Sequence, residues 1–120
     1  MARPQLSTLQ INKVMKDDDS YLGTFAINKI PTPPPHKNVS FIVNLQSDNL
    51  PGNHWVAVRR LANGRGEYFD SFGRMPPMEI QHWLVKHSND WTHNTIRYQK
   101  PNDKSACGYL CIAYLKNMIK

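Results

Sequence analysis

The chain has 120 residues, 40% hydrophobic and 20% charged, a balance typical of one folded domain and not of a disordered segment. No apolar run approaches the roughly 20 residues that a membrane-spanning helix needs, and the opening residues MARPQLSTLQ lack the apolar core of a secretory signal. We therefore expect a single soluble domain over residues 1–120 that is intracellular, not secreted and monomeric, with no membrane partner.

The chain is also basic, with a formal net charge of +6 at pH 7 and a pI of about 9.5. Because counterion release favours the binding of Lys and Arg surfaces to polyanions, non-specific contact with DNA is one expectation. The other is a solvated basic surface that keeps the domain soluble. The basic residues form no block, which argues against sequence-specific readout.

The first third of the chain predicts one helix, one irregular connection and one strand. Ser7 is a suitable N-cap for a helix over residues 7–16, where apolar residues recur at helical spacing. A glycine breaks residues 21–25, and four prolines make residues 30–37 an irregular connection. Residues 39–46 then alternate between two faces, which predicts a strand.

The rest of the chain predicts three more strands and two helices. Residues 54–61 and 67–72 are strands joined by a hairpin turn in the NGRG sequence, so they are expected to pair antiparallel. A helix follows over residues 78–87, a short strand over 95–99, and a last helix from Cys107 onward. The fold class is therefore α+β, a small mixed or antiparallel sheet packed against helices.

Two cysteines, Cys107 and Cys111, stand four residues apart in that last helix. A disulfide framework or a zinc site lacks support, because the chain has no other cysteine and no further CxxC or HxxxH motif. Cys107 lies where unpaired helical N–H groups favour a thiolate, as a nucleophile requires. Cys111 lies one turn further along and is expected to be a small buried hydrophobe.

A cysteine hydrolase also needs a base, a group that orients the base and an oxyanion donor. His54 opens one strand of the predicted hairpin and Asp70 lies in the other, so an imidazole and a carboxylate can meet. Gln99 precedes Cys107 by eight residues and could donate to an oxyanion. Each has an ordinary alternative, namely a strand-edge histidine, an Asx turn and a surface amide.

The order His, acid, Gln, Cys resembles that of the adenovirus endopeptidase (adenain) family of cysteine proteases. The resemblance covers roughly residues 20–115 and is carried by the segments YLGTF, PHKNVSFIVN, GNHWVAV, YFDSFG and PNDKSACGYLC. It implies the α+β peptidase fold of the adenain and ubiquitin-like-protease type. The chain would then be a short relative from a DNA virus, a virophage or a virus-like transposon.

The resemblance also implies roles for individual residues. Cys107 would be the nucleophile, His54 its base, Asp70 the partner of that base and Gln99 the oxyanion donor. The implied substrates are viral capsid and core precursor proteins, cut after small residues such as glycine. The implied setting is the virion and the nucleus or virus factory of an infected cell. No cofactor is required and no metal ligands are expected.

Four further residues are expected to bind substrate. Gly52 and Asn53, in the turn before His54, would form a wall of the groove, and Gly108 would leave room for the substrate. Trp55 would also stack near the imidazole of His54 and favour its cationic form.

Two departures from the adenain pattern bear on regulation and chemistry. The adenovirus enzymes usually carry Glu at the position of Asp70. Asp is shorter than Glu but is a chemically adequate acid. The segment THNTIRY, residues 92–98, has no cysteine with which to capture an activating peptide covalently. Activation by DNA, or by a noncovalent viral peptide added at a sheet edge, stays open.

Two alternatives also stay open. A protease that removes SUMO or other ubiquitin-like proteins would share the His, Asp, Gln, Cys order. A non-catalytic basic module that binds DNA or capsid would keep the fold without the reaction.

Overall fold

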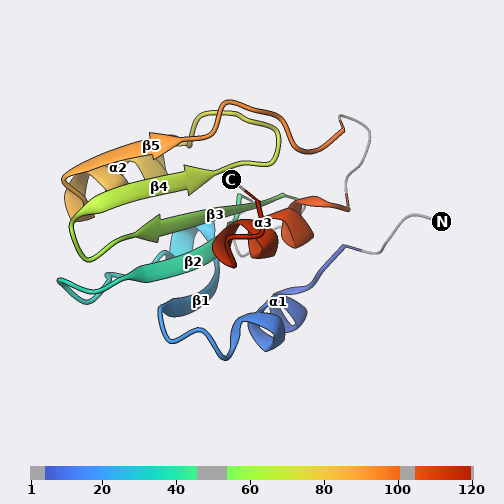
Figure 1. The fold of residues 1–120 in the computed structure, drawn as a ribbon, viewed down its shortest axis with the longest axis horizontal. Helices are drawn as coiled ribbons and strands as arrows, with labels where there is room; N and C mark the ends of the chain where they lie inside the picture. The colour runs from blue at the N-terminus through green and yellow to red at the C-terminus, as the bar shows by residue number, and fades with distance from the viewer. Residues whose placement is uncertain (1–4, 46–53, 101–104, 120) are drawn as a thin grey trace.

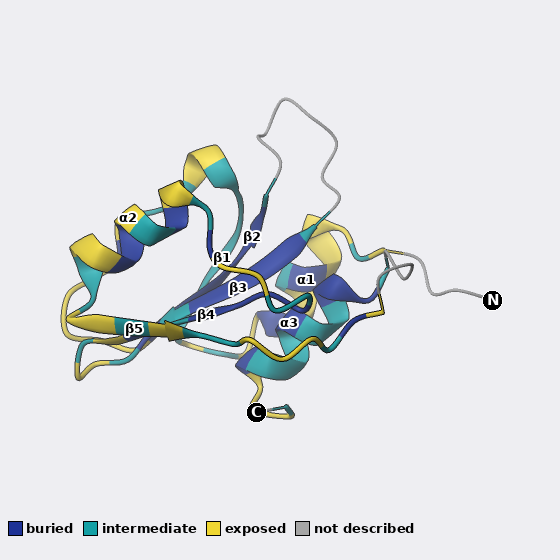
Figure 2. Ribbon diagram, turned by 90° about the horizontal axis from the view of Figure 1, so that it is seen from above, coloured by how far each residue is buried: buried dark blue, intermediate teal, exposed yellow. Residues whose placement is uncertain are grey.

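The computed structural model describes residues 5–45, 54–100 and 105–119. These residues form one five-stranded mixed sheet, with α1 and α3 on one face and α2 on the other (Figures 1 and 2). The elements in chain order are α1 (Thr8–Met15), β1 (Tyr21–Ala26), the 3-10 helix η1 (Ile27–Lys29), β2 (Val39–Asn44), β3 (Trp55–Arg60), β4 (Arg65–Phe69), α2 (Met78–His87), β5 (Asp90–His93) and α3 (Cys107–Leu115).

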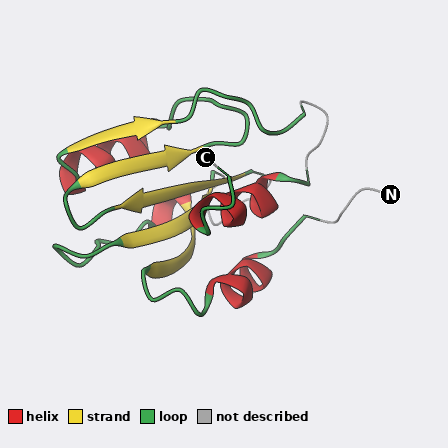
Figure 3. Ribbon diagram, viewed as in Figure 1, coloured by secondary structure: helices red, strands yellow, loops and turns green. Residues whose placement is uncertain are grey.

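The strands lie in sequence order across the sheet, β1-β2-β3-β4-β5 (Figure 3). The central pairs, β2 with β3 and β3 with β4, are antiparallel, whereas the two outer pairs are parallel. The predicted α+β class with a small mixed sheet is therefore confirmed. Among the described residues, no helix combines the length and apolarity that a bilayer crossing requires.

Two hydrophobic clusters cover the two faces of the sheet. On one face, α1 and α3 pack against alternate residues of the central strands, such as Ile42 and Ala57. On the other face, α2 packs against the intervening residues, such as Phe41 and Val58. Because β2 and β3 are covered on both sides, every residue of β2 is buried, and so is every residue of β3 except Arg59.

Local sequence signals account for the helices. Ser7 caps α1 as predicted, and a reciprocal capping box joins its side chain and backbone to Gln10. The bounds of α2 are those predicted, residues 78–87. The last helix begins at Cys107 as predicted but ends at Leu115. Met118, whose spacing suggested that it shares the buried face, lies beyond this end and is exposed.

Two edges of the sheet differ from the sequence-based expectation. Residues 21–26, where Gly23 suggested a break, form β1, and the glycine adopts a positive φ beside an irregularity in the pairing with β2. The strand predicted at 95–99 is wrong, because the last strand is β5, at residues 90–93. Edge strands are only partly covered, so they show weaker hydrophobic alternation than central ones.

Candidate active site

The antiparallel β3–β4 pair brings His54 and Asp70 to the same end of the sheet. His54 immediately precedes β3 and Asp70 immediately follows β4, so the two residues flank paired strand ends. The Nε2 atom of His54 lies 3.0 Å from Oδ1 of Asp70. The carboxylate is 2% exposed and the imidazole 12% exposed, so water screens this contact weakly.

Backbone and amide groups hold the Asp70 carboxylate in place. Its Oδ1 atom also accepts the N–H of Phe72 at 2.8 Å. The side-chain amide of Asn94 accepts the N–H of Asp70 at 3.0 Å and donates to its carbonyl at 2.7 Å. Arg74 approaches Oδ2 at 3.6 Å from the exposed side. These contacts fix the backbone of Asp70 and aim one carboxylate oxygen at the imidazole.

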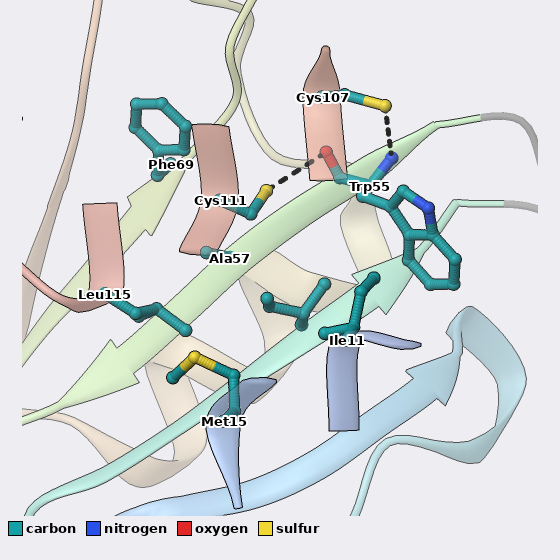
Figure 4. Close-up of a cluster of buried hydrophobic side chains, with 9 residues drawn as sticks. Ile11, Met15, Trp55, Ala57, Phe69, Cys107, Cys111 and Leu115 are labelled. Atoms are coloured by element: carbon teal, nitrogen blue, oxygen red, sulfur yellow. Dashed lines mark hydrogen bonds between the residues drawn. The ribbon is translucent and has the colours of Figure 1, made fainter. Parts of the chain in front are cut away.

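The two cysteines contact the backbone N–H and the carbonyl of one residue of β3, Trp55 (Figure 4). The N–H of Trp55 donates to Sγ of Cys107 at 3.4 Å, and Sγ of Cys111 donates to the carbonyl of Trp55 at 3.4 Å. Both thiols are free and buried. The pair of contacts docks the start of α3 onto the start of β3, directly beside His54.

Cys107 and His54 interact so that each favours the charged form of the other. Burial lowers the pKa of the His54 imidazole, but its hydrogen bonds to Asp70 and Cys107, with the charges of both partners, raise the pKa to about 9. Burial raises the pKa of the Cys107 thiol, but His54 and the N–H groups of Trp55 and Gly108 lower it overall. The arrangement favours a thiolate–imidazolium pair.

Cys111 has a different electrostatic environment. It is fully buried, and burial raises the pKa of its thiol, with the nearby charges of Cys107 and Asp70 acting in the same direction. It therefore stays a neutral thiol, in agreement with the prediction of a small buried hydrophobe.

Gln99 is buried, at 3% exposure, and a residue next to Asp70 holds it at two points. The hydroxyl of Ser71 donates to Oε1 of Gln99, and the carbonyl of Ser71 accepts the N–H groups of Tyr98 and Gln99. With Oε1 bound to the hydroxyl, Nε2 is the end of the amide that can donate to an oxyanion. Asp70 and Ser71 are neighbours in the chain. Asp70 contacts His54 and Ser71 holds Gln99, so this pair of residues links the imidazole to the amide.

Trp55 does not stack on His54 as the sequence suggested. The ring beside the imidazole is Phe72, at 5.2 Å between centroids. The indole of Trp55 is buried in the core and donates from Nε1 to the carbonyl of Leu6 at 3.2 Å. Strand alternation explains the difference, since successive side chains at positions 54 and 55 point to opposite faces.

Gly108 has a visible packing role. A Cβ atom built there would lie 3.2 Å from the indole of Trp55 and 3.3 Å from Leu6, so the glycine lets α3 approach β3 closely. The contacts of Trp55 and Gly108 with substrate stay predictions. Gly52 and Asn53, with the groove wall expected there, lie outside the described residues.

Sequence reasoning missed Ser71, Phe72 and Asn94. The FDSF segment holds the first two and was recognised as characteristic, so its neighbouring residues could have been added to the site. No pattern in the sequence distinguishes Asn94. Within the described residues, no group of three His, Cys, Asp or Glu side chains is arranged to hold a metal ion.

No family model matches this chain, and no curated protein matches its sequence. Its fold, however, matches solved structures. Two crystal structures of the ASFV pS273R protease, one of them with selenomethionine, match with TM-scores of 0.62 and 0.60 at 16% identity. The match covers 95% of this chain and 59% and 58% of the protease chains.

The central domain of an uncharacterised protein from Legionella pneumophila, Lpg1148, matches with a TM-score of 0.60 at 14% identity. This match covers 97% of the present chain and 77% of that one. At such identities the likeness establishes a shared fold, and that fold is found in a protease. The resemblance to the adenain family stays a prediction.

Proposed function

We propose that this protein is a cysteine endopeptidase in which Cys107 is the nucleophile, His54 the general acid and base, and Asp70 the orienter of the imidazole. The observation that carries the proposal is geometric: Cys107 docks on the N–H of Trp55, the residue after His54, and the imidazole of His54 lies 3.0 Å from a buried carboxylate. These surroundings lower the pKa of the thiol and raise that of the imidazole. Such a thiolate–imidazolium pair is the reactive form of a catalytic cysteine. The fold shared with the ASFV protease supports a protease function in general.

The acylation step follows from these positions. The Cys107 thiolate attacks the scissile carbonyl carbon, and the resulting tetrahedral oxyanion is stabilised by the Nε2 group of Gln99 and the N–H at the start of α3. Because Asp70 contacts Nε2 of His54, Nδ1 is the nitrogen that faces the reacting atoms. The imidazolium gives its proton to the leaving amine as the C–N bond breaks, which leaves a thioester.

Deacylation reverses the roles. Neutral His54 takes a proton from water, the hydroxide attacks the thioester carbon, and the C–S bond breaks to restore the thiolate and the imidazolium. Besides the substrate, these steps use only water and the chain's own side-chain and backbone groups.

The proposed substrates are viral capsid and core precursor proteins, cut after small residues such as glycine, in the virion or the infected cell. This part of the proposal comes from the resemblance of the sequence to the adenain family. Activation by DNA or by a noncovalent viral peptide belongs to the same proposal. A ubiquitin-like fusion that ends in diglycine is the competing substrate.

The test is covalent labelling with a peptide vinyl sulfone ending in glycine, followed by mass spectrometry of the labelled peptides. We expect one label per chain, on Cys107, and a strong loss of labelling in His54→Ala. The control Cys111→Ala removes the other thiol and should leave Cys107 as the labelled residue, at a rate reduced only several-fold.

The labelling reaction is run with and without DNA, and cleavage of a capsid-type precursor peptide is compared with cleavage of the diglycine fusion. Preference for the fusion would reassign the substrate class. The proposal would be refuted if Cys107 were labelled no faster than a small free thiol and neither substrate were cleaved. That outcome would favour the non-catalytic binding module.

A further inference from the structure

A second feature of the molecule lies on the α2 face of the sheet, away from Cys107. A cavity of about 330 Å³ opens between the proline-rich segment, the end of β3 and the end of α2. Its ionisable lining residues are His36, Arg60, Lys86 and His87, and none of its lining residues is Asp or Glu. The cavity is therefore wholly cationic or neutral.

Arg60 gives the cavity wall a permanent positive charge. It is the last residue of β3 and continues the row of Val56 and Val58 that faces α2, with only 6% of its surface exposed. Its Nη2 group donates to the carbonyls of Pro34 and Lys37 at 2.7 and 2.8 Å. Among the described residues, no carboxylate forms an ion pair with it. A buried charge of this kind favours a nearby anion.

The positive charge of Arg60 is one of the influences on the pKa of His87. Its ring packs 5.0 Å from that of Trp83, and burial, with the charges of Lys86 and Arg60, lowers its pKa. Glu79 does not line this cavity but lines an adjoining one, which Lys86 and His87 line as well. An anion beside His87 would therefore reverse an existing repulsion.

Two further groups complete the surroundings of His87. His36 lines the cavity from the opposite wall and holds a left-handed backbone conformation at φ 59°, which is uncommon for a residue with a side chain. His82, one helical turn before Lys86, lines the adjoining cavity. Neither side chain is a carboxylate, so neither opposes an anion.

We propose that this cavity binds a small phosphate-bearing anion. Arg60 and Lys86 hold the anion, and the protonated imidazole of His87 is its third cationic partner. Guanidinium and ammonium groups are the usual protein partners of phosphate oxygens. The volume suits a small phosphorylated molecule. The site lies about 16 Å along β3 from the start of that strand, so it stands independently of the proposed peptidase chemistry.

The test is an NMR titration of the isotope-labelled full chain with pyrophosphate, at an ionic strength kept constant with sodium chloride. We expect saturable shifts confined to residues around the cavity. Lys86→Gln should weaken binding about tenfold, as the loss of one charge-assisted contact does. The matched control is Lys16→Gln at the end of α1, which removes the same charge on the other face and should change affinity less than about twofold.

A second titration uses sulfate, whose charge does not change near neutral pH, and follows the His87 ring signals as pH is varied. We expect sulfate to raise the pKa of His87, so affinity increases as pH falls. Unsaturable shifts, equal effects of Lys16→Gln and Lys86→Gln, or a His87 titration that sulfate leaves unchanged would overturn the proposal. Binding of duplex DNA without a response to pyrophosphate would also overturn it.

Discussion

Replacing Asp70 by Asn tests the electrostatic basis of the site most directly. The substitution keeps the shape of the side chain but removes the charge 3.0 Å from Nε2 of His54. The contact with Asp70 is the first of the influences that raise the pKa of His54 from 6.5 to about 9. That rise corresponds to about 3 kcal/mol in favour of the imidazolium, at 1.36 kcal/mol per pKa unit.

The expected consequence is a lower and narrower pH profile. In the parent protein the reactive pair exists above the lowered pKa of Cys107 and below the pKa of His54, about 9, so activity falls as pH rises through that value. Loss of most of the 3 kcal/mol in Asp70→Asn should move the alkaline limb toward neutral pH. Near pH 8 the population of the pair should fall about 10- to 30-fold.

The assay is the rate of Cys107 alkylation by iodoacetamide, and of peptide cleavage, from acid to alkaline pH. Asp90→Asn is the matched control, because this exposed carboxylate in β5 carries the same charge far from His54. Asp70→Asn profiles that superimpose on those of the parent or of Asp90→Asn would refute the electrostatic reasoning.

Substitutions at four other positions probe the remaining contacts. Gln99→Ala should lower kcat about 10²–10³-fold through loss of an oxyanion donor, and Ser71→Ala about tenfold through a misoriented amide, both with Cys107 alkylation unchanged. Cys111→Ala should slow Cys107 alkylation several-fold and Cys111→Ser less, because a hydroxyl can still donate to the Trp55 carbonyl. Gly73→Ala should cost about 1–3 kcal/mol in urea unfolding, because the glycine has φ 75° and its new Cβ would lie 2.7 Å from the carbonyl oxygen of Thr95.

Controls separate these effects from general destabilisation. Ser40→Ala is the control for Ser71→Ala, since the hydroxyl of Ser40 is buried without a hydrogen-bond partner among the described residues and its loss should leave kcat unchanged. If Ser71→Ala and Gln99→Ala combine additively, the two residues do not act through one amide. A stable Gly73→Ala protein would show that the turn after Asp70 can relax.

The sequence by itself determined the parts of the protein that depend on local pattern. The apolar spacing of residues 78–87 and the cap at Ser7 predicted helices that the structure contains. The alternation in β2 and the NGRG turn predicted the central strands and hence the approach of His54 to Asp70. These features need only short-range preferences, which nearby residues encode.

Only the tertiary structure decided how distant segments meet. The edge strands β1 and β5 form because β2 and β4 offer them partners, although their own sequences carry turn-forming residues. The docking of Cys107 and Cys111 on the backbone of Trp55 in β3 follows from packing across the sheet. The same packing places the ring of Phe72, and not that of Trp55, beside His54. Contacts between residues more than 50 positions apart depend on the whole core, so no local pattern specifies them.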